Sequence, residues 1–70
     1  MERQPVDSSA IRSAGYDPVR KVLELEFAGG TVYEYYDVPE EDYQSLMKTD
    51  SPGSFFNDEI KDAYRALKIG

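Results

Sequence analysis

Apolar and polar side chains alternate over residues 20–27, and this is the clearest pattern in the chain. In an extended strand, Leu23, Leu25 and Phe27 would point to one side and the glutamates between them to the other. A period of two with one apolar set is typical of a strand that buries one face. We therefore predict a strand over residues 20–27 with one solvated face.

A second strand is predicted over residues 31–38, and the loop before it decides which way its tyrosines point. A one-residue change of register turns every side chain to the opposite face of a sheet. A two-residue loop would place Leu25 opposite Glu34, whereas a three-residue loop over residues 28–30 gives one apolar and one polar face. The longer loop also puts Gly30 where the turn needs a left-handed backbone. We choose it, and it predicts two cross-strand pairs: Leu25 with Tyr33, and Leu23 with Tyr35.

The segments before the hairpin carry weaker signals. Residues 1–7 are predicted to form a flexible tail, because they are mostly polar and include a proline. A first strand is predicted over residues 9–16, anchored by Ile11 and Tyr16. Residues 17–18, an aspartate followed by a proline, then form a turn.

Two helices are predicted after the hairpin. The first covers residues 39–48, with Pro39 at the first helical position and three acidic side chains in the first turn, where they complement the helix dipole. The second covers residues 54–68 and begins at Ser54 or at Asn57, either of which can cap a helix. Helical spacing of apolar residues predicts the two inward faces: Tyr43, Leu46 and Met47 in the first helix, and Phe56, Ile60, Ala63, Tyr64 and Leu67 in the second.

Together these elements predict an α+β fold, in which a three-stranded antiparallel meander has one face covered by the two helices. Seventy residues leave room for one small hydrophobic core, so residues 8–70 are expected to form one domain. No stretch is long and apolar enough to span a membrane, and the N-terminus lacks the pattern of a signal peptide. We expect a soluble, cytoplasmic protein that is a monomer or a weak dimer.

The composition narrows the chemistry of the chain. It has no cysteine and no histidine, which removes the thiolate nucleophile and the side chain that most often transfers protons or binds metals near neutral pH. The helix dipoles explain the acidic clusters at the starts of both helices. We therefore expect no enzymatic activity, no metal site and no cofactor. The net charge of −6 also disfavours long-range attraction to polyanions.

Aromatic residues on a sheet can form a stacking platform for nucleic-acid bases. The predicted register instead buries Tyr33 and Tyr35 against leucines and leaves Tyr36 on the opposite, open face. That open face also carries three carboxylates, those of Glu24, Glu26 and Glu34. Carboxylates repel phosphate, so no RNA site is expected on the sheet surface.

Basic residues offer a different candidate site. Lys61, Arg65 and Lys68 are spaced i, i+4 and i+7, so they would form one stripe on the predicted second helix. Three further cations would extend this stripe if the first strand and its turn lie nearby: Arg12, Arg20 and Lys21. Contacts from such a stripe to nucleic-acid phosphates would weaken as salt rises. A solvated helix face explains the same residues, and we favour that interpretation.

An ordered series of residues runs through most of the chain. It begins with Ser8-Ser9, Gly15-Tyr16-Asp17, Leu23 through Phe27, Gly30, Tyr33, Tyr35, Val38-Pro39, Tyr43 and Leu46. It continues with Ser51-x-Gly53, Phe55-Phe56-Asn57, Ile60-Lys61 and Tyr64. This series resembles the KTSC domain, a family named after a C-terminal extension of some lysyl-tRNA synthetases that also occurs as small free-standing bacterial proteins.

The resemblance implies no established activity, and RNA binding is suggested for the family through its association with the synthetases. It also makes Ser51 and Gly53 characteristic positions, where a hydroxyl and free amides at a helix start could bind an anion. We favour a structural role for both, as part of the turn before the helix. The other motif residues are interpreted as structural too: Gly30, Tyr33, Tyr35, Phe56, Ile60 and Tyr64.

The sequence thus predicts a small non-enzymatic domain that acts as a protein-interaction or accessory module. Its favoured partner is another protein, of unknown identity. The alternative is weak binding of RNA or tRNA, for which the basic stripe would be the site.

Overall fold

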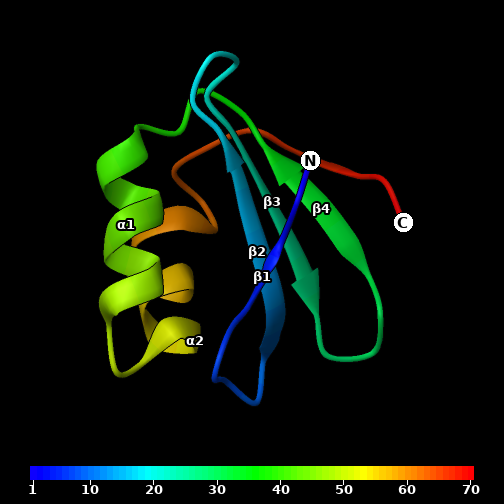
Figure 1. Ribbon diagram of the computed structural model, residues 1–70, viewed down its shortest axis with the longest axis vertical. Coiled ribbons are helices and arrows are strands. Elements are labelled where there is room, and N and C mark those ends of the chain that lie inside the picture. Colours follow the sequence, from blue (N-terminus) through cyan, green and yellow to red (C-terminus); the bar gives the residue numbers. More distant parts are fainter.

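A single antiparallel sheet, with helices against one of its faces, makes up the computed structural model, which describes residues 1–70 (Figure 1). The strands lie side by side in chain order: β1 (Gln4–Pro5), β2 (Ile11–Asp17), β3 (Val22–Phe27), β4 (Val32–Tyr35) and β5 (Ala66–Lys68). The helices are α1 (Glu40–Lys48) and α2 (Pro52–Phe55), and α2 continues into a π-helical turn, η1 (Phe56–Ile60). The α+β class is confirmed, but the sheet has five strands where three were predicted. No helix has the length and apolar character needed to cross a membrane.

The hairpin of β3 and β4 has the predicted register, and its pairs include Leu25 with Tyr33 and Leu23 with Tyr35. The loop holds three residues, and it is closed by a hydrogen bond of 2.8 Å from the Phe27 N–H to the Thr31 carbonyl. Both loop glycines have a positive φ, 101° at Gly29 and 96° at Gly30. Glycine adopts this conformation without strain, so the double glycine fixes the register of the hairpin.

The inner face of the sheet holds an aromatic cluster that connects β3 and β4 to the helical layer. Phe56 of η1 lies edge-on to Phe27, with ring centroids 5.1 Å apart, and to Tyr35, at 5.6 Å. Tyr35 is only 5% exposed, and burial raises the pKa of its phenol to about 12. Under the rings lie fully buried aliphatic side chains: Ile11, Leu23, Leu25, Val38, Leu46 and Ile60. Tyr35 is therefore part of the core, as predicted, whereas Tyr33 is only partly buried and packs against the core.

The first predicted strand corresponds to β2, which contains a bulge that the sequence analysis did not foresee. Ile11 pairs with Phe27, whereas Ser13 pairs with Glu26, so Arg12 is an extra residue on the β2 side. Without this insertion, Ile11 and Tyr16 would face opposite sides of the sheet, because they are an odd number of residues apart. The bulge lets both side chains face the helical layer and directs Arg12 outward.

The predicted second helix, residues 54–68, is wrong at both ends. It begins at Pro52 instead of Ser54 or Asn57, and it ends at Ile60. The segment that follows forms β5, although its residues have high helical propensity. Pairing with β4 explains the difference, because it gives partners to backbone groups of β4 that would otherwise form an exposed sheet edge. Tertiary hydrogen bonding overrides the local preference here.

The first predicted helix agrees closely with α1. Pro39 occupies the N-cap position, so the helix begins at Glu40, one residue later than predicted. The first turn carries the expected acidic side chains: Glu40, Glu41 and Asp42. Leu46 is fully buried, and Tyr43 and Met47 pack at the edge of the core. The inward face of α1 is therefore confirmed.

The N-terminal residues join the sheet, where a flexible tail was predicted. Gln4 pairs with Ala14, and Pro5 pairs with Ser13. The residues before β1 cross the outer face of the sheet, on the side away from the helices (Figure 1). We call residues 1–5 the N-terminal strap. It covers Glu24 so closely that this side chain is only 9% exposed, so the outer face is not the open, solvated surface that we expected.

Truncating the central aromatic residue of the core should destabilise the protein strongly. Because Tyr35 is buried against Phe56, we expect Tyr35→Ala to lower the free energy of unfolding by about 3 kcal/mol. Urea-induced unfolding monitored by circular dichroism measures this value. Tyr36→Ala is the matched control, because Tyr36 lies on the other face and is only partly buried. Equal losses for the two variants would contradict the packing.

A methyl group at Gly15 should displace the N-terminal strap. A Cβ atom there would lie 2.5 Å from the backbone oxygen of Glu2, which is too close for both to keep their places. We expect Gly15→Ala to cost about 1–3 kcal/mol of stability, the usual penalty for overpacking. In a chain that lacks residues 1–3 the same substitution should cost almost nothing. An unchanged cost in the shortened chain would show that the strap does not cover Gly15.

Candidate interaction surface

The predicted basic stripe does not form, because its residues are not on a helix. Lys61 lies in the turn after η1, Arg65 directly precedes β5 and Lys68 ends β5. Along a strand, residues an odd number apart point to opposite faces. Arg65 therefore lies on the outer face with Leu67, while Lys68 lies on the inner face and pairs with Tyr33. All three basic side chains are exposed.

The remaining basic candidates are divided between two regions. Arg20 and Arg65 lie close enough to Tyr36 for their positive charges to lower the pKa of its phenol. The hydrogen bond from this phenol to Glu34 has the larger effect, and the pKa is raised overall. Lys21 is exposed in the turn before β3, and Arg12 lies on the bulge at the other end of β2. The six predicted cations thus form no continuous patch.

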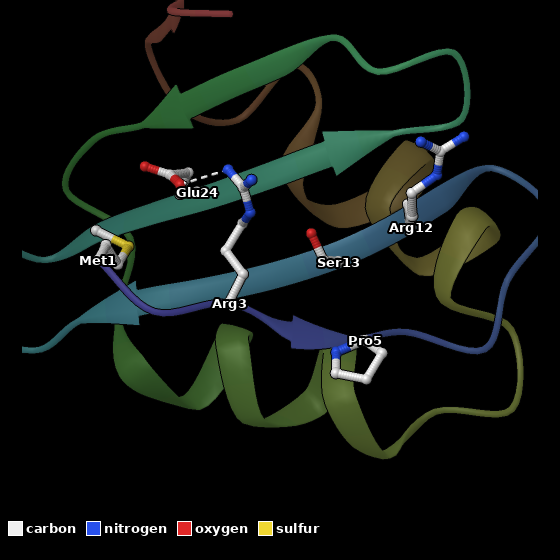
Figure 2. A pocket seen from close by; sticks show the side chains of 6 residues that line it. All are labelled: Met1, Arg3, Pro5, Arg12, Ser13 and Glu24. Carbon is white, nitrogen blue, oxygen red and sulfur yellow. Dashed lines mark hydrogen bonds and ion pairs between the residues drawn. The ribbon is translucent and has the colours of Figure 1, made fainter.

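A shallow hollow of about 480 Å³ opens beside the N-terminal strap (Figure 2). It is lined by Met1, Arg3, Pro5, Arg12, Ser13 and Glu24. Arg3 reaches from the strap to the Glu24 carboxylate at 2.6 Å. Arg12 lies 3.7 Å from the Glu26 carboxylate, which also accepts a hydrogen bond of 2.9 Å from the Ser13 hydroxyl. Both arginines in the hollow therefore already have an anionic partner, and the ion pair of Arg3 with Glu24 fastens the strap to the sheet.

The predicted anion site at Ser51 and Gly53 lies at the start of α2, where Ser51 is exposed and Gly53 is partly buried. Ser51 occupies the N-cap position of α2, but its side chain makes no capping hydrogen bond. A Cβ atom at Gly53 would lie 3.5 Å from the Ala10 side chain and 3.8 Å from the Ser8 hydroxyl. That hydroxyl accepts hydrogen bonds from two backbone N–H groups of the loop before β2. These are ordinary van der Waals distances, so a side chain would fit at Gly53, and the contact of this turn with the loop favours a structural role.

The other motif residues also hold the fold together. Gly30 sets the hairpin turn, and Tyr33, Tyr35, Phe56 and Ile60 belong to the core or pack against it. Tyr64 lies in the turn before β5, where its hydroxyl donates a hydrogen bond to the Asp42 carboxylate in α1. This bond anchors the start of β5 to the helical layer.

The structure reveals a surface that the sequence analysis missed, the outer edge of β5. Leu67 is 56% exposed and Ile69 is 47% exposed. The segment lies beyond β4, at the side of the sheet opposite β1 (Figure 1). Alternation of apolar and basic residues over 67–69 was the available signal. It was hidden because Ile60, Tyr64 and Leu67 also fit a helical spacing.

Comparison with known proteins identifies the family. The family model of the KTSC domain matches residues 7–64. The chain belongs to the KTSC domain family. The crystal structure of a KTSC domain protein from Yersinia pestis superimposes with a TM-score of 0.95 and 45% sequence identity, covering 99% of this chain and 97% of that one.

Sequence relatives of this KTSC domain fall into two groups. Small relatives match almost from end to end. A protein from Tsukamurella paurometabola is 47% identical over 94% of this chain and 98% of its own length. An uncharacterized protein from Stutzerimonas stutzeri is 46% identical over 99% of both chains. A lysine–tRNA ligase from Nostoc sp. is 34% identical over 84% of this chain, but the match covers 10% of the ligase. The KTSC domain therefore occurs both alone and as part of a larger enzyme.

The hydrogen bond between Tyr64 and Asp42 should make stability depend on pH in alkaline solution. This bond is the main reason why the pKa of Tyr64 is raised from 10.0 to about 12, and burial adds to it. Because the folded state holds the proton more tightly, the contribution is complete below pH 10 and is lost as the pH rises through about 12. We expect Tyr64→Phe to lower the free energy of unfolding at neutral pH. Between pH 10 and about 12, the free energy of unfolding of this variant should fall less steeply than that of the wild type.

Urea unfolding at a series of pH values measures this profile, and the difference in phenolate absorbance between the wild type and Tyr64→Phe gives the pKa of Tyr64. Asp42→Asn is the matched control, because it removes the negative charge and leaves the Tyr64 hydroxyl in place. A Tyr64 that titrates at its ordinary pKa would contradict the bond. Other tyrosines also have raised pKa values, so the decline should shrink in Tyr64→Phe without vanishing.

Proposed function

We propose that this KTSC domain is a non-catalytic protein-interaction module and that it binds an extended segment of its partner along the outer edge of β5. The observation that carries the proposal is the unpaired backbone of this edge strand. Proteins recognise extended peptides in this way by adding the peptide as a further strand.

The direction of the backbone groups follows from two hydrogen bonds. The Tyr36 N–H donates to the Arg65 carbonyl at 2.9 Å, and the Ile69 N–H donates to the Val32 carbonyl at 2.8 Å. Backbone groups alternate in direction along an antiparallel strand. The N–H and C=O groups of Ala66 and Lys68 therefore point away from β4, toward the place that an added strand would occupy.

The two edges of the sheet differ in their capacity to accept a strand. β1 has only two residues, and one of them is Pro5, which has no N–H to donate. Short edge strands that contain proline are a common protection against unwanted pairing. β5 has no proline and exposes Leu67, whose side chain can pack against a partner. This contrast supports β5 as the docking edge.

Selection from a library of random displayed peptides tests the proposal. The wild-type domain should enrich peptides that bind, and Lys68→Pro should not, because proline removes an outward N–H without breaking a hydrogen bond to β4. Lys68→Ala is the matched control: it keeps the N–H and should still select peptides. Amide shifts of β4 in NMR spectra report whether each variant keeps the sheet intact.

Hydrogen exchange on the wild-type domain gives a readout that needs no variant. A bound peptide should slow exchange of the Ala66 and Lys68 amides, because strand addition gives both a partner. The amide of Gln4, on the opposite edge, should exchange as before. Docking at this edge would be refuted if the selected peptides bind the wild type and Lys68→Pro equally and leave the Ala66 and Lys68 amides unprotected.

A further inference from the structure

The β5 edge carries two cations, Arg65 and Lys68, that make no salt bridge. The protein has a net charge of −6, yet its two salt bridges are made by Arg3 and Arg12, both beside the N-terminal strap. Arg65 and Lys68 flank the exposed Leu67 and take part in neither salt bridge. The docking edge is thus a short basic segment on an acidic protein.

The side chains of this segment alternate in chemistry as well as in direction. Leu67 points to the outer face, and Lys68 points to the inner face beside Tyr33. A strand added next to β5 would place its own side chains alternately beside an isobutyl group and beside an ammonium group. Opposite charges on neighbouring strands stabilise a sheet, as do pairs of apolar side chains. The best complement is therefore a strand in which acidic and apolar residues alternate.

We propose that the natural ligand of the β5 edge is an extended protein segment in which aspartate or glutamate alternates with branched apolar residues. This inference rests on the proposed function, because it specifies the chemistry of the partner at the same edge. Acidic residues of the segment lie on the inner face beside Lys68, apolar residues lie on the outer face beside Leu67 and Ile69, and the backbone pairs with Ala66 and Lys68.

A second copy of this chain fits the edge less well. In a twofold antiparallel pairing centred on Leu67, each Lys68 would lie opposite Ala66 and each Arg65 opposite Ile69. The two paired segments, residues 65–69 of each protomer, would then hold four cations and no carboxylate. Both protomers would also carry the same net charge. The two Lys68 side chains would be diagonal neighbours on one face, within reach of each other, where their like charges repel. The charge pattern therefore selects a partner of different sequence.

RNA is also a weaker fit than an acidic peptide. Single-stranded RNA is usually read by aromatic side chains that stack on its bases, but Tyr35 is buried in the core and Tyr33 packs against it. Tyr36 is partly buried, and its hydroxyl is bonded to Glu34. Neither an unpaired strand edge nor the exposed Leu67 offers anything specific to a phosphate backbone, whereas both complement a peptide.

Fluorescence anisotropy with labelled peptides of about eight residues, enough to span a short strand, tests the proposal. The first peptide alternates glutamate and valine, the second alternates lysine and valine, and the third has the composition of the first arranged in two blocks. We expect the first peptide to bind about tenfold more tightly than either of the others at low salt, because only it matches both charge and alternation. The preference should shrink as salt rises.

Charge reversal of the edge supplies the matched variants. Arg65→Glu with Lys68→Glu should weaken binding of the glutamate–valine peptide about tenfold and favour the lysine–valine peptide instead. Lys21→Glu with Lys48→Glu changes the net charge equally at exposed sites outside β5, so it should leave the preference intact. Equal effects of the two double variants would overturn the proposal, because they would show that overall charge alone matters.

The outcomes separate this inference from the proposed function. If the lysine–valine peptide binds best to the wild type and protects the Ala66 and Lys68 amides, the edge is a docking site but the acidic partner is refuted. If no peptide protects these amides, both proposals fail. A single-stranded oligouridine could displace the bound peptide and shift the amide NMR signals of Arg65 and Lys68 more strongly than the peptide does. That result would refute the acidic peptide as ligand and indicate RNA instead.

Discussion

The length of the loop between β3 and β4 is the constraint on which the rest of this structure depends. Three residues, two of them glycines with positive φ, place Tyr33 and Tyr35 on the same face as Leu23 and Leu25. A loop shorter by one residue would turn the tyrosines away from the helices and bring carboxylates toward the core. The aromatic contacts of η1 and the separation of an apolar from a polar face both follow from this turn.

Local patterns predicted the central part of the fold because its residues satisfy local and tertiary preferences together. The alternation over β3, the turn glycines and the acidic first turn of α1 each point to the structure that forms. The last segment could not be predicted in this way, because Ile60, Tyr64 and Leu67 fit a helix while β4 requires a pairing partner. The β2 bulge at Arg12 was equally hidden, since a single inserted residue leaves no periodic trace.

The candidate site was predicted less well than the core, for a related reason. The cations Arg65 and Lys68 were identified from the sequence, but the helix on which they were placed does not exist. Reassigning them to a strand divides them between two faces and brings Leu67 and unpaired backbone groups into the same surface. The strap had a similar effect on the outer face, where Arg3 converts an expected repulsive glutamate, Glu24, into half of an ion pair.

The unequal edges of the sheet limit what this domain can build. Growth of a sheet into a filament requires each molecule to accept a strand at one edge and to offer a second open edge to the next molecule. The proline in β1 closes one edge, so a strand added at β5 has no successor within the same sheet. In the docking that we propose, association along the sheet would therefore end after a single step, and the domain could keep one open edge without polymerising.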